Sequence, residues 1–146
     1  MKYLLDTNIC IYYFKNQFDL AQKFHEKGIH QCAISEITYA ELLYGAEKSQ
    51  NVAKNMQKID ELLKQVAIIP VYNGLKIYSK EKAKLSSMGR LISDFDLLIG
   101  ATAIAYDMIM VTRNMKEFER LDNIKLENWV DDYHKPTLRE EIYKLY

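Results

Sequence analysis

The sequence has few cysteines, no net charge and no long apolar run, and each absence narrows the class of protein. Its two cysteines, Cys10 and Cys32, each lie beside apolar residues. We therefore expect free, buried thiols in a reducing compartment rather than a disulfide or a metal site. Twenty basic residues balance twenty acidic ones, so only local clustering of charge could indicate nucleic-acid binding.

Sequence features that direct a chain to a membrane or to another compartment are also missing. No stretch reaches the roughly 18 apolar residues that a membrane span needs. Lys2 is followed by only three apolar residues before Asp6, which is too few for a secretory signal. With 146 residues and no linker, low-complexity segment or internal repeat, a single domain is expected. These features predict a cytoplasmic protein with no membrane partner.

Several common catalytic motifs are absent as well. The chain has no Walker phosphate-binding loop, no G-x-G-x-x-G, no H-E-x-x-H and no G-x-S-x-G. Its histidines, His25, His30 and His134, are dispersed and follow no metal-ligand spacing. The acidic side chains are therefore the main candidates for chemistry.

The apolar pattern predicts strands that alternate with helices along the chain. The predicted strands span residues 2–5, 30–34, 67–71, 108–112 and 125–127, and the predicted helices span 8–15, 18–27, 35–47, 51–65, 73–88, 94–106 and 115–120. Pro70 favours an edge position for the third strand, and the continuous apolar run of the fourth suits burial on both faces. This alternation predicts an α/β fold with a parallel sheet covered on both faces.

Acidic residues occur where predicted strands end and helices begin. Asp6 ends the first strand, Asp94 and Asp96 open the most apolar helix, and Asn114 and Glu117 follow the fourth strand. Because the carboxyl ends of parallel strands meet at one edge, we expect these side chains to converge. Clustered carboxylates repel one another unless a proton or a cation neutralises them, and oxygen ligands suit Mg²⁺ or Mn²⁺.

Each of these acids also has a purely structural interpretation. Asp6 could cap the helix that follows it, and Asp96 could complete a capping box with Ser93. Asp94 lies about 200° around the helix from Asp96, so it is expected at the surface or behind the site. Glu41 lies well inside its predicted helix and could be an ordinary solvated side chain. The spacing alone leaves these alternatives open.

Four blocks of the sequence resemble the signature segments of PIN-domain ribonucleases, in the same order and spacing. They read L-L-D-T-N-I at 4–9, I-S-E-I-T-Y-A-E-L-L-Y-G-A-E-K-S at 34–49, D-L-L-I-G-A-T-A-I-A at 96–105 and V-T-R-N-M-K-E-F-E-R at 111–120. The similarity is greatest to VapC-type toxins of type II toxin–antitoxin systems. It implies a PIN-like nuclease domain over residues 1–130 and a C-terminal extension over 131–146.

The resemblance further implies a three-layer α/β/α sandwich with a mainly parallel central sheet, and cleavage of RNA with Mg²⁺ or Mn²⁺. By matching motifs, it assigns the catalytic and metal-binding acids to Asp6, Glu41, Asp96 and Glu117. The family often has its fourth acid directly after T-R or T-N, where this chain has Asn114, a weaker metal ligand. Glu117 is therefore expected to supply the fourth acid.

The other predicted site residues surround these acids. Supporting positions are assigned to Thr7, Asn8, Asp94, Thr112 and Asn114. Substrate-binding positions are assigned to Arg113 and Lys116 beside the site, and to Lys84 and Arg90 in a basic segment that leads to the Asp96 helix. That basic segment could equally be a solvated, lysine-rich helix.

The function implied by the resemblance is that of a metal-dependent endoribonuclease, the toxin of a VapBC-type pair. Structured RNA is the expected substrate, with a tRNA anticodon loop favoured over ribosomal RNA. A VapB-like antitoxin and a homodimer are the expected assemblies. Two alternatives stay open, namely a non-catalytic PIN-like module that binds RNA or protein, which Asn114 would favour, and a DNA nuclease.

Overall fold

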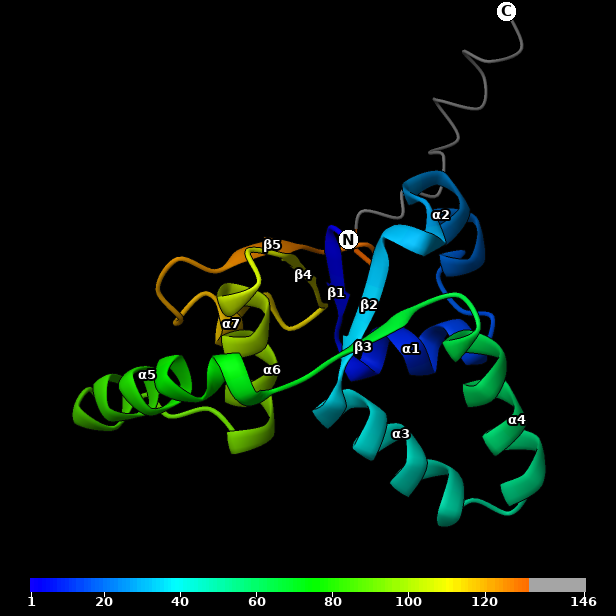
Figure 1. Cartoon of the computed structure of the whole chain (residues 1–146), viewed down its shortest axis with the longest axis horizontal. Helices are drawn as coiled ribbons and strands as arrows, with labels where there is room; N and C mark the ends of the chain where they lie inside the picture. Colours follow the sequence, from blue (N-terminus) through cyan, green and yellow to red (C-terminus); the bar gives the residue numbers. More distant parts are fainter. Residues whose placement is uncertain (132–146) are drawn as a thin grey trace, which may run out of the picture.

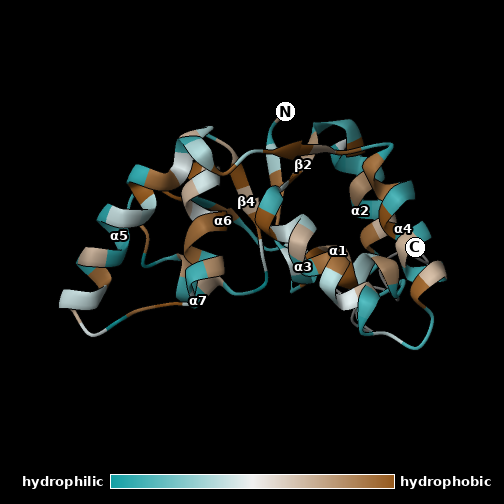
Figure 2. Cartoon of the chain, turned by 60° about the horizontal axis from the view of Figure 1, so that its bottom comes forward, coloured by the Kyte–Doolittle hydropathy of each residue, from teal (hydrophilic) through white to brown (hydrophobic). Residues whose placement is uncertain are grey.

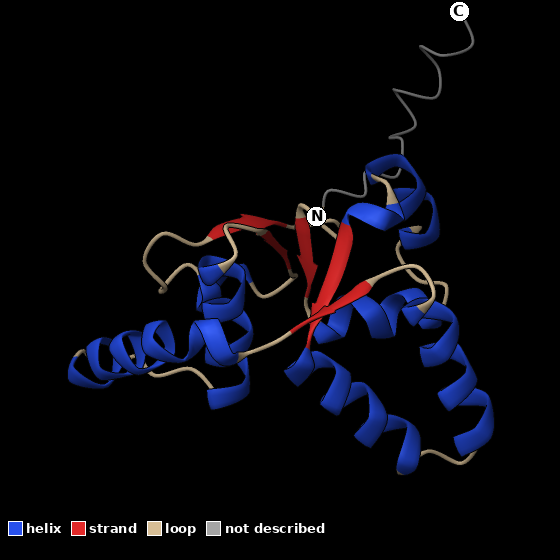
Figure 3. Ribbon diagram, viewed as in Figure 1, coloured by secondary structure: helices blue, strands red, loops and turns tan. Residues whose placement is uncertain are grey.

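The computed structural model describes residues 1–131, which form a five-stranded sheet with helices on both faces (Figures 1 and 3). Every pair of neighbouring strands is parallel, and the strand order is β3-β2-β1-β4-β5. The strands are β1 (Tyr3–Leu5), β2 (Cys32–Ser35), β3 (Ala67–Ile69), β4 (Ile109–Val111) and β5 (Lys125–Glu127). The α/β fold and its parallel sheet are confirmed, and β3 lies at an edge as Pro70 indicated.

The helices fall into two groups according to the strands that they connect (Figure 1). Those that link β1, β2 and β3 cover one face: α1 (Thr7–Phe14), α2 (Leu20–Lys27), α3 (Glu36–Glu47) and α4 (Val52–Leu63). Those between β3 and β5 cover the other: α5 (Leu75–Ser87), α6 (Asp94–Ala105) and α7 (Met115–Phe118). Short 3₁₀ turns, η1 (Ile29–Gln31) and η2 (Tyr72–Gly74), precede β2 and α5. The ends of the predicted elements differ from these by no more than two residues.

The sheet divides the hydrophobic core in two, because successive residues of a strand point to opposite faces. Tyr3 and Leu5 of β1 pack with α1–α4, whereas Leu4 packs with α5–α7. On the first face Trp129 is buried with its ring centroid 5.0 Å from that of Tyr3. Figure 2 shows hydrophobic residues along the central strands and along α6, which is consistent with a core on each side of the sheet.

Cys10 and Cys32 are free and buried, as predicted. Within residues 1–131, no helix combines the length and the apolar character that crossing a membrane requires. The predicted C-terminal extension, 131–146, lies outside the described residues apart from Asp131.

Helix α6 is central to the site because it fixes the position of Asp96. Its buried side consists of small and aliphatic residues that belong to the core between the sheet and α5–α7, among them Leu97, Ile99 and Ala103. Ser93 caps the helix, with the Asp96 backbone N–H donating to Ser93 Oγ at 3.2 Å. Packing and cap together hold the start of α6 in place, so the structural interpretation of Asp96 as part of a capping turn is compatible with a functional one.

The turn η2 packs so closely on α6 that Gly74 has no room for a side chain. A Cβ at Gly74 would lie 3.0 Å from backbone atoms of Ala101 and Thr102. Gly74→Ala is therefore expected to lower the free energy of unfolding by about 1–3 kcal/mol, measured by urea denaturation. Gly45→Ala in α3 is the matched control, because no atom lies within 4 Å of its Cβ position and the helix should gain about 0.5–1 kcal/mol. Equal stability of the two variants would contradict this packing.

Candidate functional site

The order of the strands creates a crevice at the carboxyl end of β1. From β1 the chain extends the sheet through β2 and β3 on one side, and then returns to add β4 and β5 on the other. Ligands of open parallel sheets bind at such a reversal. A cavity of about 610 Å³ is lined by Asp6 after β1, Glu41 of α3 and Asp96 of α6. Three distant segments therefore bring carboxylates to one cavity.

Asp6 is the most buried of these acids, with 5% of its surface exposed. Its Oδ1 accepts a hydrogen bond from the Thr7 backbone N–H at 2.8 Å, and its Oδ2 accepts one from the Thr112 hydroxyl at 2.8 Å. The pKa of Asp6 is raised from 3.8 to about 6, first by burial and then by the negative charges of Asp96 and Glu41, against the effect of both hydrogen bonds. Asp6 thus caps α1 and also contributes a poorly solvated carboxylate to the cavity.

Glu41 is held at the cavity by a contact between helices. The Thr7 hydroxyl of α1 donates to Glu41 Oε1 at 2.7 Å and lies 3.1 Å from the Thr38 hydroxyl oxygen. Because Thr7 belongs to α1 and Glu41 to α3, this bond joins the two helices beside Asp6. Thr7 is itself buried. Glu41 is therefore an oriented side chain rather than a freely solvated one.

Asp96 interacts with Glu117, the acid that follows β4. Burial raises the pKa of Asp96, the charge of Glu117 raises it further, and the Ser93 side chain lowers it. Asn114 Nδ2 donates to Glu117 Oε2 at 2.7 Å, and the Asn114 backbone N–H donates to Thr112 Oγ1 at 3.0 Å. Glu117 does not line the cavity and acts on Asp96 through its charge, while Asn114 orients it.

The remaining supporting residues are not all beside the cavity. Thr7 and Asn8 line it. Asp94 does not, because its carboxylate accepts from the Tyr78 hydroxyl at 2.9 Å and pairs with Lys82 at 2.8 Å. The hydrogen bond from Lys82 lowers the pKa of Asp94. Asp94 therefore faces α5, in agreement with its angular separation from Asp96.

Arg113 is fixed next to the site by aromatic rings and one acid. It follows Thr112 in the chain, and its guanidinium carbon lies 5.1 Å from the Phe18 ring centroid and 5.8 Å from that of Tyr12. One guanidinium nitrogen lies 3.5 Å from Asp131 Oδ1. These contacts hold the cation at the carboxyl end of β4.

The other predicted basic positions differ from one another. Lys84 is bound to Glu81 at 2.7 Å and to Asp122 at 3.0 Å, and it does not line the cavity. Its contacts give it a structural role in joining α5 to the segment after α7. Lys116 and Arg90 are exposed and also lie outside the cavity lining. Neither of the two residues predicted from the basic segment, Lys84 and Arg90, therefore lines the cavity.

Six residues of the cavity lining were not predicted from the sequence, namely Ile11, Ala40, Tyr44, Gly45, Lys48 and Phe95. A signal for Tyr44 was available, since it lies three residues after Glu41 and so on the same face of α3. Phe95 lies between Asp94 and Asp96, but a phenylalanine in so apolar a helix is expected to belong to the hydrophobic core. Its exposure could be found only from the structure.

The donor atoms at the cavity suit a hard divalent cation. Carboxylates are the acidic donors, and neither histidine nor cysteine belongs to the described lining. Across residues 1–131, no group of three or more His, Cys, Asp or Glu side chains forms a ready-made metal cage. Mg²⁺ commonly binds through one or two carboxylates and keeps several waters, so the donor set fits a largely hydrated ion.

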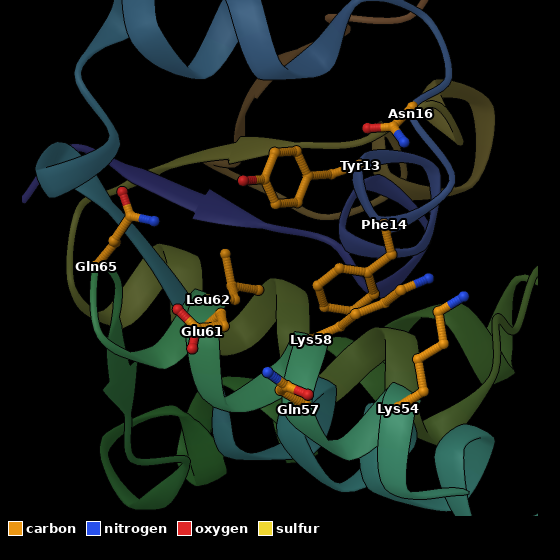
Figure 4. A pocket seen from close by; sticks show the side chains of 9 residues that line it. All are labelled: Tyr13, Phe14, Asn16, Lys54, Gln57, Lys58, Glu61, Leu62 and Gln65. Atoms are coloured by element: carbon orange, nitrogen blue, oxygen red, sulfur yellow. The ribbon is translucent and has the colours of Figure 1, made fainter. Parts of the chain in front are cut away.

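A second hollow, of about 330 Å³, lies between α1 and α4 (Figure 4). Tyr13 and Phe14 line it from α1, and Lys54, Lys58 and Glu61 line it from α4. Its charges are mixed, and none of the converging acids belongs to it. The cavity at Asp6 is therefore the better candidate for catalysis.

Comparisons with known proteins match the chain to one family. A family model described as the PIN domain matches residues 3–124. "Ribonuclease VapC2" of Haemophilus influenzae is 38% identical over 132 residues, covering 89% of this chain and 99% of the relative. The "tRNA(fMet)-specific endonuclease VapC" of Shigella flexneri is 34% identical over 131 residues, covering 88% of this chain and 98% of the relative.

Solved structures give the same picture. VapBC2 of Rickettsia felis, crystallised with a DNA fragment from its promoter, matches with a TM-score of 0.81 and 38% identity, over 88% of this chain and 99% of that one. DNA-bound VapBC of Salmonella typhimurium matches with a TM-score of 0.82 and 30% identity, over 88% and 98% of the two chains. The similarity thus extends over nearly the full length of these relatives.

Proposed function

Because this chain belongs to the PIN domain family and, within it, to the VapC ribonucleases, we propose that it hydrolyses phosphodiester bonds of structured RNA at the Asp6 cavity. Mg²⁺ or Mn²⁺ is the proposed cofactor. The observation that carries the proposal is the convergence of Asp6, Glu41 and Asp96 from three segments on one cavity. Like charges so arranged favour a bound cation.

In the proposed mechanism, each of these residues has a defined role. Asp6 and Asp96 would hold the ion, and Glu41 would complete the site directly or through water. The ion, when bound, would activate a water and offset charge on the phosphate. Thr112 and the Thr7 backbone N–H keep the Asp6 carboxylate oriented through their two 2.8 Å hydrogen bonds. Glu117, oriented by Asn114, adds negative charge beside Asp96.

For the substrate, we favour a tRNA, cut in its anticodon loop. The Shigella flexneri and Salmonella typhimurium relatives are named tRNA(fMet)-specific endonucleases and are 34% and 31% identical to this chain. Arg113 and Lys116, which follow β4, are proposed to contact phosphates. A tRNA substrate also makes the cytoplasm the expected place of action.

For its partners, we propose a VapB-like antitoxin and a second copy of the chain. The related Rickettsia felis and Salmonella typhimurium structures are of VapBC proteins, which supports an antitoxin partner. Analytical ultracentrifugation of the chain alone and with the product of the neighbouring gene tests both assemblies.

Purified protein is expected to cleave tRNA with Mg²⁺ or Mn²⁺ and to leave it intact in EDTA. Asp96→Asn should lower the cleavage rate by more than about 100-fold, since even residues behind a metal ligand are worth 10- to 100-fold. Asp94→Asn is the matched control, because Asp94 faces Lys82 rather than the cavity. Gel analysis with mapping of the cut sites gives the measurement.

Other outcomes of that assay separate the alternatives. Equal cleavage by the wild type and Asp96→Asn would mean a contaminating nuclease. Binding of tRNA without cleavage would favour the non-catalytic module. Faster cleavage of single-stranded DNA than of RNA would favour a DNA nuclease.

A further inference from the structure

Two exposed aromatic rings border the acidic cavity. Tyr44 of α3 is 66% exposed and Phe95 of α6 is 52% exposed, yet both line the cavity that contains Asp6 and Asp96. Phe95 directly precedes Asp96 in the chain, and Tyr44 follows Glu41 by three residues. Carboxylates can coordinate a cation without either ring, so cation binding does not explain why these aromatic residues line the cavity.

A cation accompanies the rings. Lys48 also lines the cavity, and its Nζ lies 5.2 Å from the centroid of the Tyr44 ring. The cavity thus combines carboxylates, two aromatic faces and an ammonium group. Proteins that bind single-stranded nucleic acid combine aromatic rings, on which the bases stack, with cations that contact the backbone.

We propose that Tyr44 and Phe95 each stack an unpaired base next to the scissile phosphate, while Lys48 contacts the RNA backbone. In a duplex the bases are stacked on one another and offer no free face. The two rings therefore make the enzyme specific for single-stranded loops, and they determine which phosphodiester bond of a structured RNA is cut. This inference rests on the proposed ribonuclease function.

The composition of the cavity favours RNA over a second protein surface. Exposed aromatic rings also occur in interfaces between proteins, but the centres of such interfaces are depleted in charged residues. Here Tyr44 and Phe95 share their cavity with Asp6, Asp96 and Lys48. An apolar partner would have to bury those charges together with the rings, whereas an RNA strand offers phosphates to both the lysine and a bound cation.

The test uses the full chain and an RNA hairpin with the mapped cut site in its loop. Tyr44→Ala and Phe95→Ala should each lower kcat/KM for the hairpin by about 5- to 150-fold, the value of one stacked base. Tyr44→Phe and Phe95→Tyr keep a ring and should restore the rate. Tyr72→Ala is the matched control, because Tyr72 is 78% exposed on η2 but does not line the cavity.

A second readout measures stacking without cleavage. The same hairpin carries 2-aminopurine beside the cut site, and its fluorescence is recorded in EDTA. Binding to the wild type should quench the fluorescence, and the two alanine variants should quench it less. Thermal unfolding of each variant checks that the fold is retained.

The possible results distinguish this inference from the proposed function. No cleavage of any RNA by the wild type would overturn the ribonuclease, and quenching would then be measured with 2-aminopurine in the loop of an anticodon hairpin, which tests stacking without a cut site. Wild-type cleavage with unchanged rates in both alanine variants would overturn stacking alone. Equal cleavage of the loop and of a duplex of the same sequence would overturn the loop specificity. A shift of the alanine variants from dimer to monomer in light scattering, with loss of activity, would assign the rings to self-association instead.

Discussion

Asp6→Asn is expected to abolish RNA cleavage and, in the absence of metal, to stabilise the fold at neutral pH. The loss of activity follows from the role proposed for Asp6 and should exceed about 100-fold, as for Asp96→Asn. The gain in stability follows from the burial of Asp6, which makes its ionised form costly in the native state. The two effects of opposite sign would separate a functional carboxylate from a structural one.

The pH dependence gives the sign and the range of this stabilisation. The Asp6 carboxyl has a pKa of about 6 in the native protein, against 3.8 for the unfolded chain. Between these values the native state binds the additional proton, so wild-type stability falls as the pH rises through this window. Above pH 6 the full cost is present, and two pKa units correspond to at most about 3 kcal/mol. An asparagine does not ionise and removes that cost.

The hydrogen bonds of Asp6 need not be lost in the variant. An amide oxygen can accept from the Thr7 backbone N–H, and an amide NH₂ can donate to the Thr112 hydroxyl oxygen. Urea denaturation in EDTA at pH 4 and pH 8 should therefore show a stabilisation of about 1–3 kcal/mol at pH 8 and a smaller one at pH 4. Asp94→Asn is the control of opposite sign, because Lys82 lowers the pKa of Asp94. A variant that is less stable than the wild type at pH 8 would contradict the assignment of a raised pKa to Asp6.

The sequence predicted the framework of this site because that framework depends on local patterns. Apolar periodicity predicts each strand and α-helix, and the rule that parallel strands end at one edge predicts that Asp6 and Asp96 lie close together. The capping role of Ser93 was equally local. Where a side chain's surroundings follow from the elements that immediately flank it, the sequence is sufficient.

Contacts between distant helices could not be predicted in this way. The bond from Thr7 to Glu41 joins residues 34 apart and depends on how α1 packs against α3. Lys84 was expected near the substrate because its segment is basic. It instead forms an ion pair with Asp122, which lies 38 residues later in the sequence. The sequence shows which charges are present, while tertiary packing decides which of them remain available.

The hydroxyl of Thr112 gives the second large expected effect, because it joins two strand ends at the site. It donates to Asp6 Oδ2 at 2.8 Å and accepts from the Asn114 backbone N–H at 3.0 Å. Thr112→Val keeps the shape of the side chain but removes both hydrogen bonds. We expect the affinity for Mn²⁺, measured by calorimetry, to fall by about 10- to 100-fold, the usual cost of losing the group behind a metal ligand.

The same substitution should move the pH dependence of cleavage in a defined direction. The hydrogen bond from Thr112 lowers the pKa of Asp6, so its loss raises that pKa further above 3.8. Because a metal binds the deprotonated carboxylate, the pH at half-maximal cleavage should increase in Thr112→Val. Thr112→Ser retains the hydroxyl and should behave as the wild type in both measurements. If valine and serine lowered Mn²⁺ affinity equally and left the pH profile unchanged, the contribution of Thr112 would be packing of its methyl group rather than orientation of Asp6.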